Sequence, residues 1–264
     1  MRYFFRLSSI SLQSHLYYKT SFLLNLLTPI VLLFGQYMLW GALYGQQGGT
    51  IGSMTQREMF TYILIAFALN NLLGWSSENI LAKEIRSGTV VARCLRPVPF
   101  LVQSVSEMTG ALAFQALVNL LVVLAGFGLF GSRMEFPEAA AVATFIPCVI
   151  LAVLLRIMII DVFSLLCFFS TGYLGISWTR AALFDFFSGA MVPVAMFPGW
   201  LACMARYTPF PYMIQVPISV LLGDGTGMNI VQILGTQAAW LAVLVLFHCL
   251  LYSCARKNMT IAGG

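Results

Sequence analysis

The sequence predicts an all-α integral membrane protein with six transmembrane helices, and three observations support this fold class. Of the 264 residues, 60% are hydrophobic and only 9% are charged, whereas a soluble domain carries roughly 25% charged residues. The apolar residues form long runs, and a helix needs about 20 of them to cross a bilayer. Basic residues gather between these runs. We therefore expect one transmembrane domain over residues 21–264.

The predicted spans follow one another along the chain. The six apolar runs cover residues 21–44, 59–75, 108–131, 139–177, 181–197 and 229–254. The fourth run is longer than one crossing requires, so we expect that helix to project beyond the bilayer. Residues 1–20 mix aromatic and polar side chains at roughly helical spacing, which predicts an N-terminal interfacial helix on the membrane surface. A cytosolic tail is the alternative for these residues.

The segment 198–227, between the fifth and sixth runs, is apolar but interrupted. It contains Pro198, Pro209, Pro211 and Pro217. Proline ends or kinks a helix, because it lacks the backbone N–H and clashes with the preceding turn. The segment is therefore predicted to form two short re-entrant helices on the outer side rather than a complete crossing.

The distribution of basic residues sets the expected orientation. With the N-terminus in the cytosol, ten basic residues fall in cytosolic segments and three in outer segments, as the positive-inside rule requires. The cytosolic group is Arg2, Arg6, Lys19, Lys83, Arg86, Arg93, Arg96, Arg180, Arg256 and Lys257, and the outer group is Arg57, Arg133 and Arg206. Both termini are thus expected in the cytosol, at a plasma (inner) membrane of bacterial type. The net charge of +5 reflects this topology rather than nucleic-acid binding.

The cytosolic loop at 78–97 carries the densest charge in the chain, within the stretch AKEIRSGTVVARCLRPVPF. Ser76 or Ser77 is suited to cap a short helix there, and Gly88 is suited to end it. One or two further turns are expected before Pro97. The loop has two interpretations. It is either a solvated, topology-fixing loop or a docking element for a cytosolic partner.

Two motifs resemble a known transporter family. Between the second and third spans, E-I-R-S-G is followed by L-R-P. This order resembles the pattern found at the same place in the membrane subunit of ABC-2 type ATP-binding-cassette exporters. The stretch FFSGAMVPVAMFPGWL, at 186–201, resembles the family's late fifth span. Two further stretches also fit the family's sequence: LYYKTSFLLNLL near the N-terminus and LW-x-ALY at 39–44. The resemblance covers most of the chain in order and spacing.

The resemblance implies a fold and a set of partners. The family pattern is a dimer of six-span permeases, so the second permease is identical or related to this chain. Two copies of a cytosolic P-loop ATPase are implied, each seated on the loop between spans two and three, which acts as a coupling helix. The resemblance assigns this docking role to Glu84, Arg86, Gly88 and Arg96. Arginine suits such a contact because its planar fork grips carboxylates and carbonyls.

The chain itself is predicted to be a permease subunit and not an enzyme. A Walker A motif requires a Gly-Lys pair, and the sequence has none. ATP and Mg²⁺ are therefore expected on the partner ATPase and no cofactor on this chain. The six cysteines form no C-x-x-C pair, which argues against a metal site or a disulfide set.

Polar and small residues inside the spans complete the candidate sites. Arg156 and Asp161 lie in the fourth run, where each costs about 2.5–3.5 kcal/mol at the bilayer centre. They either pair within the protein, lie near a polar cavity or the cytosolic helix end, or line a substrate or proton route. Candidate dimer contacts are the G-x-x-x-G residues Gly41 and Gly45 and, by the resemblance, the span-five residues Ser188 and Gly189.

The leading functional interpretation is an ABC exporter permease that moves an amphipathic or lipophilic substrate outward, as in multidrug or natural-product efflux. One alternative is an ATP-independent secondary transporter using Arg156 and Asp161. Another is a membrane scaffold whose charged loop recruits a cytosolic protein. Neither substrate identity nor the choice between homodimer and heterodimer follows from the sequence.

Overall fold

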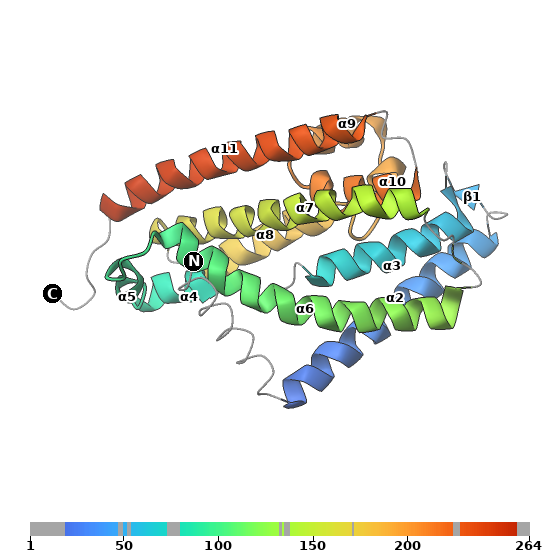
Figure 1. Ribbon diagram of the computed structural model, residues 1–264, viewed down its shortest axis with the longest axis horizontal. Helices are drawn as coiled ribbons and strands as arrows, with labels where there is room; N and C mark the ends of the chain where they lie inside the picture. Colours follow the sequence, from blue (N-terminus) through green and yellow to red (C-terminus); the bar gives the residue numbers. More distant parts are fainter. Residues whose placement is uncertain are drawn as a thin grey trace.

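The computed structural model is nearly all helical, with the long helices side by side along one axis (Figure 1). It describes residues 19–46, 50–51, 54–72, 80–131, 134, 138–170, 172–223 and 228–257. The predicted interfacial helix at 1–20 lies outside this part for all but its last two residues. The elements, with their bounds, are α2 (Lys19–Gln46), β1 (Thr50–Ile51), β2 (Met54–Thr55), α3 (Gln56–Leu72), α4 (Ile80–Ser87), α5 (Val91–Cys94), α6 (Phe100–Phe130), α7 (Ala139–Leu165), α8 (Tyr173–Phe187), α9 (Gly199–Arg206), α10 (Gln215–Leu222) and α11 (Ile230–Lys257).

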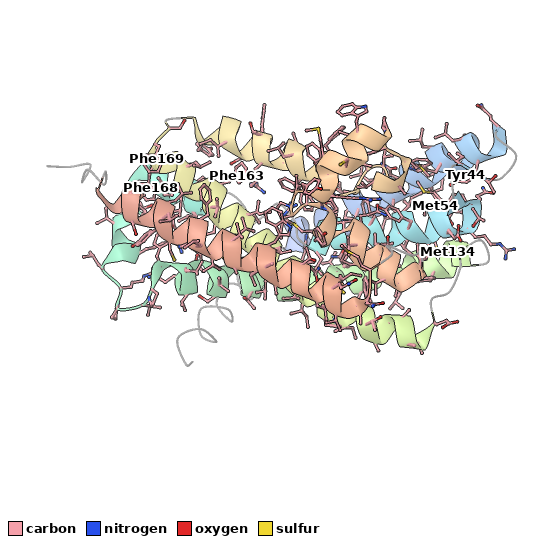
Figure 2. The ribbon with its side chains drawn as sticks, turned by 90° about the horizontal axis from the view of Figure 1, so that it is seen from above. Tyr44, Met54, Met134, Phe163, Phe168 and Phe169 are labelled. Carbon is pink, nitrogen blue, oxygen red and sulfur yellow. The ribbon has the colours of Figure 1, made fainter. Side chains whose placement is uncertain are left out.

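The two ends of the molecule differ in what they carry. The left end in Figure 1 holds α4, α5, the start of α6 and the C-terminal end of α11. The β1–β2 hairpin, α9 and α10 lie toward the other end, with the start of α11. Figure 2 shows Phe163, Phe168 and Phe169 toward the first end and Tyr44, Met54 and Met134 toward the second. The charged loop and the proline-rich segment are therefore at opposite ends, as the sequence predicts.

Helix α7 is the centre of the bundle. It contacts α11, α10, α8, α6 and α4, and its side chains are buried on most sides, including Ala152, Leu155 and Leu165 at 0% exposure. Such all-round burial fits a helix that is hydrophobic all round. The outer helices α2 and α11 instead leave many large apolar side chains exposed, among them Val31 and Val231, as helices that face lipid do.

Three described helices are long and apolar enough to cross a membrane, at Leu27–Gln46, Ala139–Phe168 and Ile230–Ala255. They correspond to the first, fourth and sixth predicted spans. Helices α3 and α8 have 17 and 15 residues, below the about 20 that a straight crossing takes. The six-span layout therefore stays a prediction.

Three predicted boundaries are wrong. Helix α6 starts at Phe100, not at residue 108 where the third run was expected to begin. The apolar run 139–177 is not one projecting helix: α7 ends at Leu165, a 3-10 turn covers Leu166–Phe168, and α8 starts at Tyr173. The break falls at Gly172, which bears the low helix propensity of glycine. Helix α8 replaces the predicted fifth span at 181–197 and ends ten residues earlier, at Phe187, because the chain turns at Gly189, where φ is +85°.

Two smaller features differ from the predictions: a short β-hairpin departs from the all-α fold class, and Arg180 lies in a helix rather than in a loop. The four residues of β1 and β2 pair as an antiparallel hairpin between α2 and α3, and the Tyr44 hydroxyl donates to the Met54 carbonyl oxygen at 3.3 Å. Arg180, predicted in a cytosolic loop, lies within α8 and is 3% exposed. It is therefore a buried helix residue rather than a loop residue, and the side of the membrane on which it lies stays a prediction.

The proline-rich segment forms two short helices, α9 and α10, as predicted. A buried polar cluster holds this segment to the bundle. The Tyr62 hydroxyl of α3 lies 2.7 Å from both the Gly189 carbonyl oxygen and Gln215 Oε1. Gln215 Oε1 also accepts a hydrogen bond from the Val194 N–H at 3.0 Å. One side chain at the start of α10 thus joins α3 to the chain beyond α8.

Candidate functional site

The charged loop folds as two short helices joined by a tight turn. Helix α4 ends at Ser87, and Gly88 follows with φ of +75°, a left-handed conformation that glycine adopts without a steric cost. The Val90 N–H then donates back to the Glu84 carbonyl oxygen at 3.2 Å. This turn redirects the chain into α5, as the position of Gly88 in the sequence predicts. Pro99 precedes the first residue of α6, where a fixed φ suits a helix start.

The apolar side of α4 and its turn packs on the ends of longer helices. Leu81, Val90, Phe100 and Leu165 form a small buried cluster. Phe168, Leu251 and Tyr252 pack against it from the ends of α7 and α11. The loop is therefore a fixed part of the bundle at this end, not a free solvated strand. We refer to residues 80–99 as the docking element, after the role that the sequence resemblance predicts for them.

Arg93 is the organising residue of the docking element. Its side chain is 4% exposed, and arginine is almost never fully buried unless it is paired. Its Nε donates to Glu84 Oε2, and its Nη2 donates to Glu84 Oε1 at 3.1 Å and to Glu107 Oε2 at 2.5 Å. Glu84 belongs to α4 and Glu107 to α6. One guanidinium thus joins two helices by charge-assisted hydrogen bonds, which are the stronger class.

The same contacts keep Arg93 ionised. Burial alone would lower the pKa of Arg93, but the hydrogen bonds that it donates to Glu84 and Glu107, and the negative charges of these carboxylates, outweigh the burial, so the pKa is raised. The group carries its charge throughout the physiological range. The two carboxylates compensate that charge where water does not reach it.

Gln103 holds the backbone of the same element. It is fully buried, and its Nε2 donates to the carbonyl oxygens of Arg93 at 3.0 Å and Val98 at 2.9 Å. Its Oε1 accepts a hydrogen bond from Arg96 Nη1 at 3.3 Å. Helix α6 therefore contacts α5 and the residues after it in two ways: Gln103 binds their backbone carbonyl oxygens, and Glu107 binds the Arg93 side chain.

The outward side of the docking element mixes basic and apolar groups. Lys83, Thr89 and Arg96 are exposed, and Leu95 is 81% exposed. Leu95 adjoins the exposed Arg96 in the sequence, and arginine is enriched at protein interfaces. The arrangement can dock a protein surface that offers an apolar hollow with carboxylates around it.

The four residues assigned to docking occupy different places. Arg96 is exposed, and Gly88 forms the turn. Glu84 directs both carboxylate oxygens to Arg93, so it shapes the element from within. Arg86 lies on α4, and its side chain is outside the described part. Sequence reasoning missed Arg93, Gln103 and Glu107 as parts of the site; the signal was a lone acid and an amide at the start of an otherwise apolar helix.

Arg156 and Asp161 are both buried, at 3% and 0% exposure, and each contacts a different neighbouring helix. The Arg156 guanidinium lies 3.4 Å from the centre of the Phe184 ring of α8. Asp161 Oδ2 lies 2.6 Å from Nδ1 of His248 of α11. His248 is the neighbour of Asp161 that the sequence did not reveal. Its single occurrence in an apolar run gave no pattern that pointed to Asp161.

The candidate dimer residues divide into inward and outward positions. Ser188 is fully buried, and a Cβ on Gly189 would lie 2.7 Å from the Tyr62 hydroxyl, so both pack inside one chain. A Cβ on Gly41 would meet Phe60 of α3 at 3.7 Å. Gly45 is exposed with open space around it. A subunit contact at these positions stays a prediction, and Gly45 is the one whose surface is free in the single chain.

Comparison with known proteins identifies the family. A family model described as ABC-2 family transporter protein matches residues 30–263, which takes in the docking element, the buried polar cluster and the proline-rich segment. No curated protein and no solved structure matches the chain. The resemblance carried by the two sequence motifs is confirmed across almost the whole chain. The chain belongs to the ABC-2 family of membrane transporter proteins.

Proposed function

We propose that the chain is the permease subunit of an ABC exporter, which moves an amphipathic or lipophilic substrate outward with ATP hydrolysed by a separate P-loop ATPase. The observation that carries this proposal is the docking element. It is braced to α6 by a buried arginine and presents Leu95 and Arg96 outward at one end of the bundle. A solvated topology loop needs neither the brace nor the exposed leucine.

The proposed assembly pairs two permeases, identical or related, with two ATPase copies, and places the docking element and both termini in the cytosol. Family membership supports an ATPase partner, and the sequence offers no Gly-Lys pair for a nucleotide site of its own. ATP binding closes the ATPase pair, and each docking element moves its helices as rigid bodies. Exposed apolar side chains of α2 and α11 face lipid or the second permease.

Docking is tested by removing the arginines at this end of the molecule. In membranes that contain the ATPase, Arg86→Ala and Arg96→Ala are expected to insert normally but to retain less ATPase during purification. Arg206→Ala is the matched control, since Arg206 is an exposed arginine on α9, at the opposite end. Wild-type ATPase retention in both docking variants would contradict the assignment, and equal loss in the control would show a general charge effect.

The ATP-independent secondary transporter remains the second candidate, because Asp161 and His248 form a buried titratable pair between α7 and α11. Export that continues after ATP is depleted and stops when the proton gradient collapses would favour it. The exporter proposal expects the reverse dependence.

A further inference from the structure

Arg93, Glu84, Glu107 and Gln103 form a polar connection that we call the α4–α6 clamp. The sequence motifs that indicate docking do not contain Arg93 or Glu107, and a partner on the outward side cannot reach a guanidinium that is 4% exposed. A buried ion pair contributes little net stability compared with apolar residues of similar volume. The clamp is therefore not a contact with the partner, and its position between α4 and α6 suits a role in transmitting movement.

The contacts of the docking element differ in kind from helix to helix. The apolar contacts of the element, through Leu81, Val90, Phe100 and Leu165, reach the ends of α7 and α11 and the start of α6, and apolar contacts are non-directional. The element also has directional contacts with α6. The Arg93 side chain donates a hydrogen bond to Glu107, and the Gln103 side chain donates one to the Arg93 carbonyl oxygen. A displacement of α4 can therefore be transmitted to α6 through directional contacts, in addition to the packing of α4 on α7 and α8.

Helix α6 suits this transmission. It has 31 residues, about 46 Å at 1.5 Å per residue, and it runs from the docking element toward the end that carries the hairpin (Figure 1). It also contacts α2, α3 and α7. A rigid element of this length carries a movement at one end of the molecule to the other.

We propose that Arg93 is a positioning residue of the transport cycle, which couples movement of the docking element to α6 through Glu84 and Glu107. This inference rests on the proposed function, because the movement originates in the partner ATPase. Arg93 itself touches neither substrate nor nucleotide. Loss of the Arg93–Glu107 contact is expected to leave the ATPase bound, because the exposed Leu95 and Arg96 are not part of that contact, and to uncouple α6 from the nucleotide state of the ATPase.

The test uses the full chain in complex with its ATPase. Spin labels at Leu124→Cys on α6 and Val231→Cys on α11, both highly exposed positions, report the distance between these helices with and without ATP plus orthovanadate. The exposed native cysteines Cys203, Cys249 and Cys254 are replaced by serine. The distance change is expected in the wild type and is expected to be lost in Glu107→Gln and Arg93→Gln, with the ATPase still bound.

Two comparisons separate coupling from mere structural damage. Arg93→Lys keeps the positive charge but replaces the guanidinium fork with a single ammonium group. It is therefore expected to show part of the distance change that Arg93→Gln loses. The double variant Arg93→Gln/Glu107→Gln is expected to lose no more of the distance change than either single variant. Each single variant already removes the same contact between Arg93 and Glu107. Glu138→Gln is the matched control: it removes a carboxylate from an exposed position before α7 and is expected to behave as wild type.

The outcomes distinguish the two proposals. A wild-type chain that retains no ATPase contradicts the proposed function, and with it the clamp. A wild-type complex whose distance change survives in Glu107→Gln contradicts the clamp alone. Loss of the ATPase in Glu107→Gln also overturns the clamp, because the residue would then serve docking and not transmission.

Discussion

At the scale of single residues, buried polar groups fix the positions where the chain departs from regular helix. Gly189 adopts φ of +85° beside the Tyr62 hydroxyl, in a space where a Cβ would meet oxygen at 2.7 Å. Gly88 adopts a similar conformation at the turn of the docking element. Glycine is the residue that takes this conformation without strain, and these two turns place the segments that follow them.

Gly189→Ala is expected to destabilise the protein. A non-glycine residue in the left-handed region costs about 1–3 kcal/mol, and the new methyl group also displaces the Tyr62 hydroxyl from its acceptors. Thermal unfolding in detergent measures the effect. Gly199→Ala is the control, because a Cβ there meets nothing within 4 Å. Equal unfolding temperatures for the two variants would contradict the described role of Gly189.

At the scale of elements, the sequence predicted the kinds of segment better than their ends. The short helix ending at Gly88, the further turn before Pro97 and the two helices among the prolines are confirmed, because glycine and proline act locally. The break between α7 and α8 was missed, because a single glycine in an apolar run is also tolerated inside helices. The start of α6 was missed because polar residues such as Gln103 and Glu107 resemble loop residues until their partners are known.

The candidate site shows the same limit. Arg96 and the turn at Gly88 follow from motifs, whereas the Arg93 pairing depends on residues from two other helices. Its partner Glu107 lies 14 positions away, beyond the reach of helical periodicity. Contacts of this kind depend on tertiary packing, so one sequence does not reveal them.

The contact between α7 and α11 gives a prediction at this scale. His248→Leu is expected to destabilise the protein strongly, by about 3–5 kcal/mol, because it leaves the Asp161 carboxylate buried without its partner. The double variant Asp161→Leu/His248→Leu is expected to recover most of that loss, since the pair is replaced by apolar side chains. Unfolding temperatures of the purified variants test this, and a double variant less stable than His248→Leu would contradict it.

At the scale of the whole molecule, the chain has two ends of different character. One end carries a docking element held by the α4–α6 clamp, and the other carries α9 and α10, tied to α3 through Tyr62 and Gln215. The central helix α7 contacts elements of both ends. The proposed ATP-driven cycle requires such a connection between the two ends.

The most direct test of the central claim is purification of the tagged chain from its native host in mild detergent, with identification of its companions by mass spectrometry. The account predicts a stoichiometric P-loop ATPase that is lost in Arg86→Ala. A chain that purifies without an ATPase, and yet transports in ATP-free proteoliposomes, would contradict it and direct attention to Asp161 and His248.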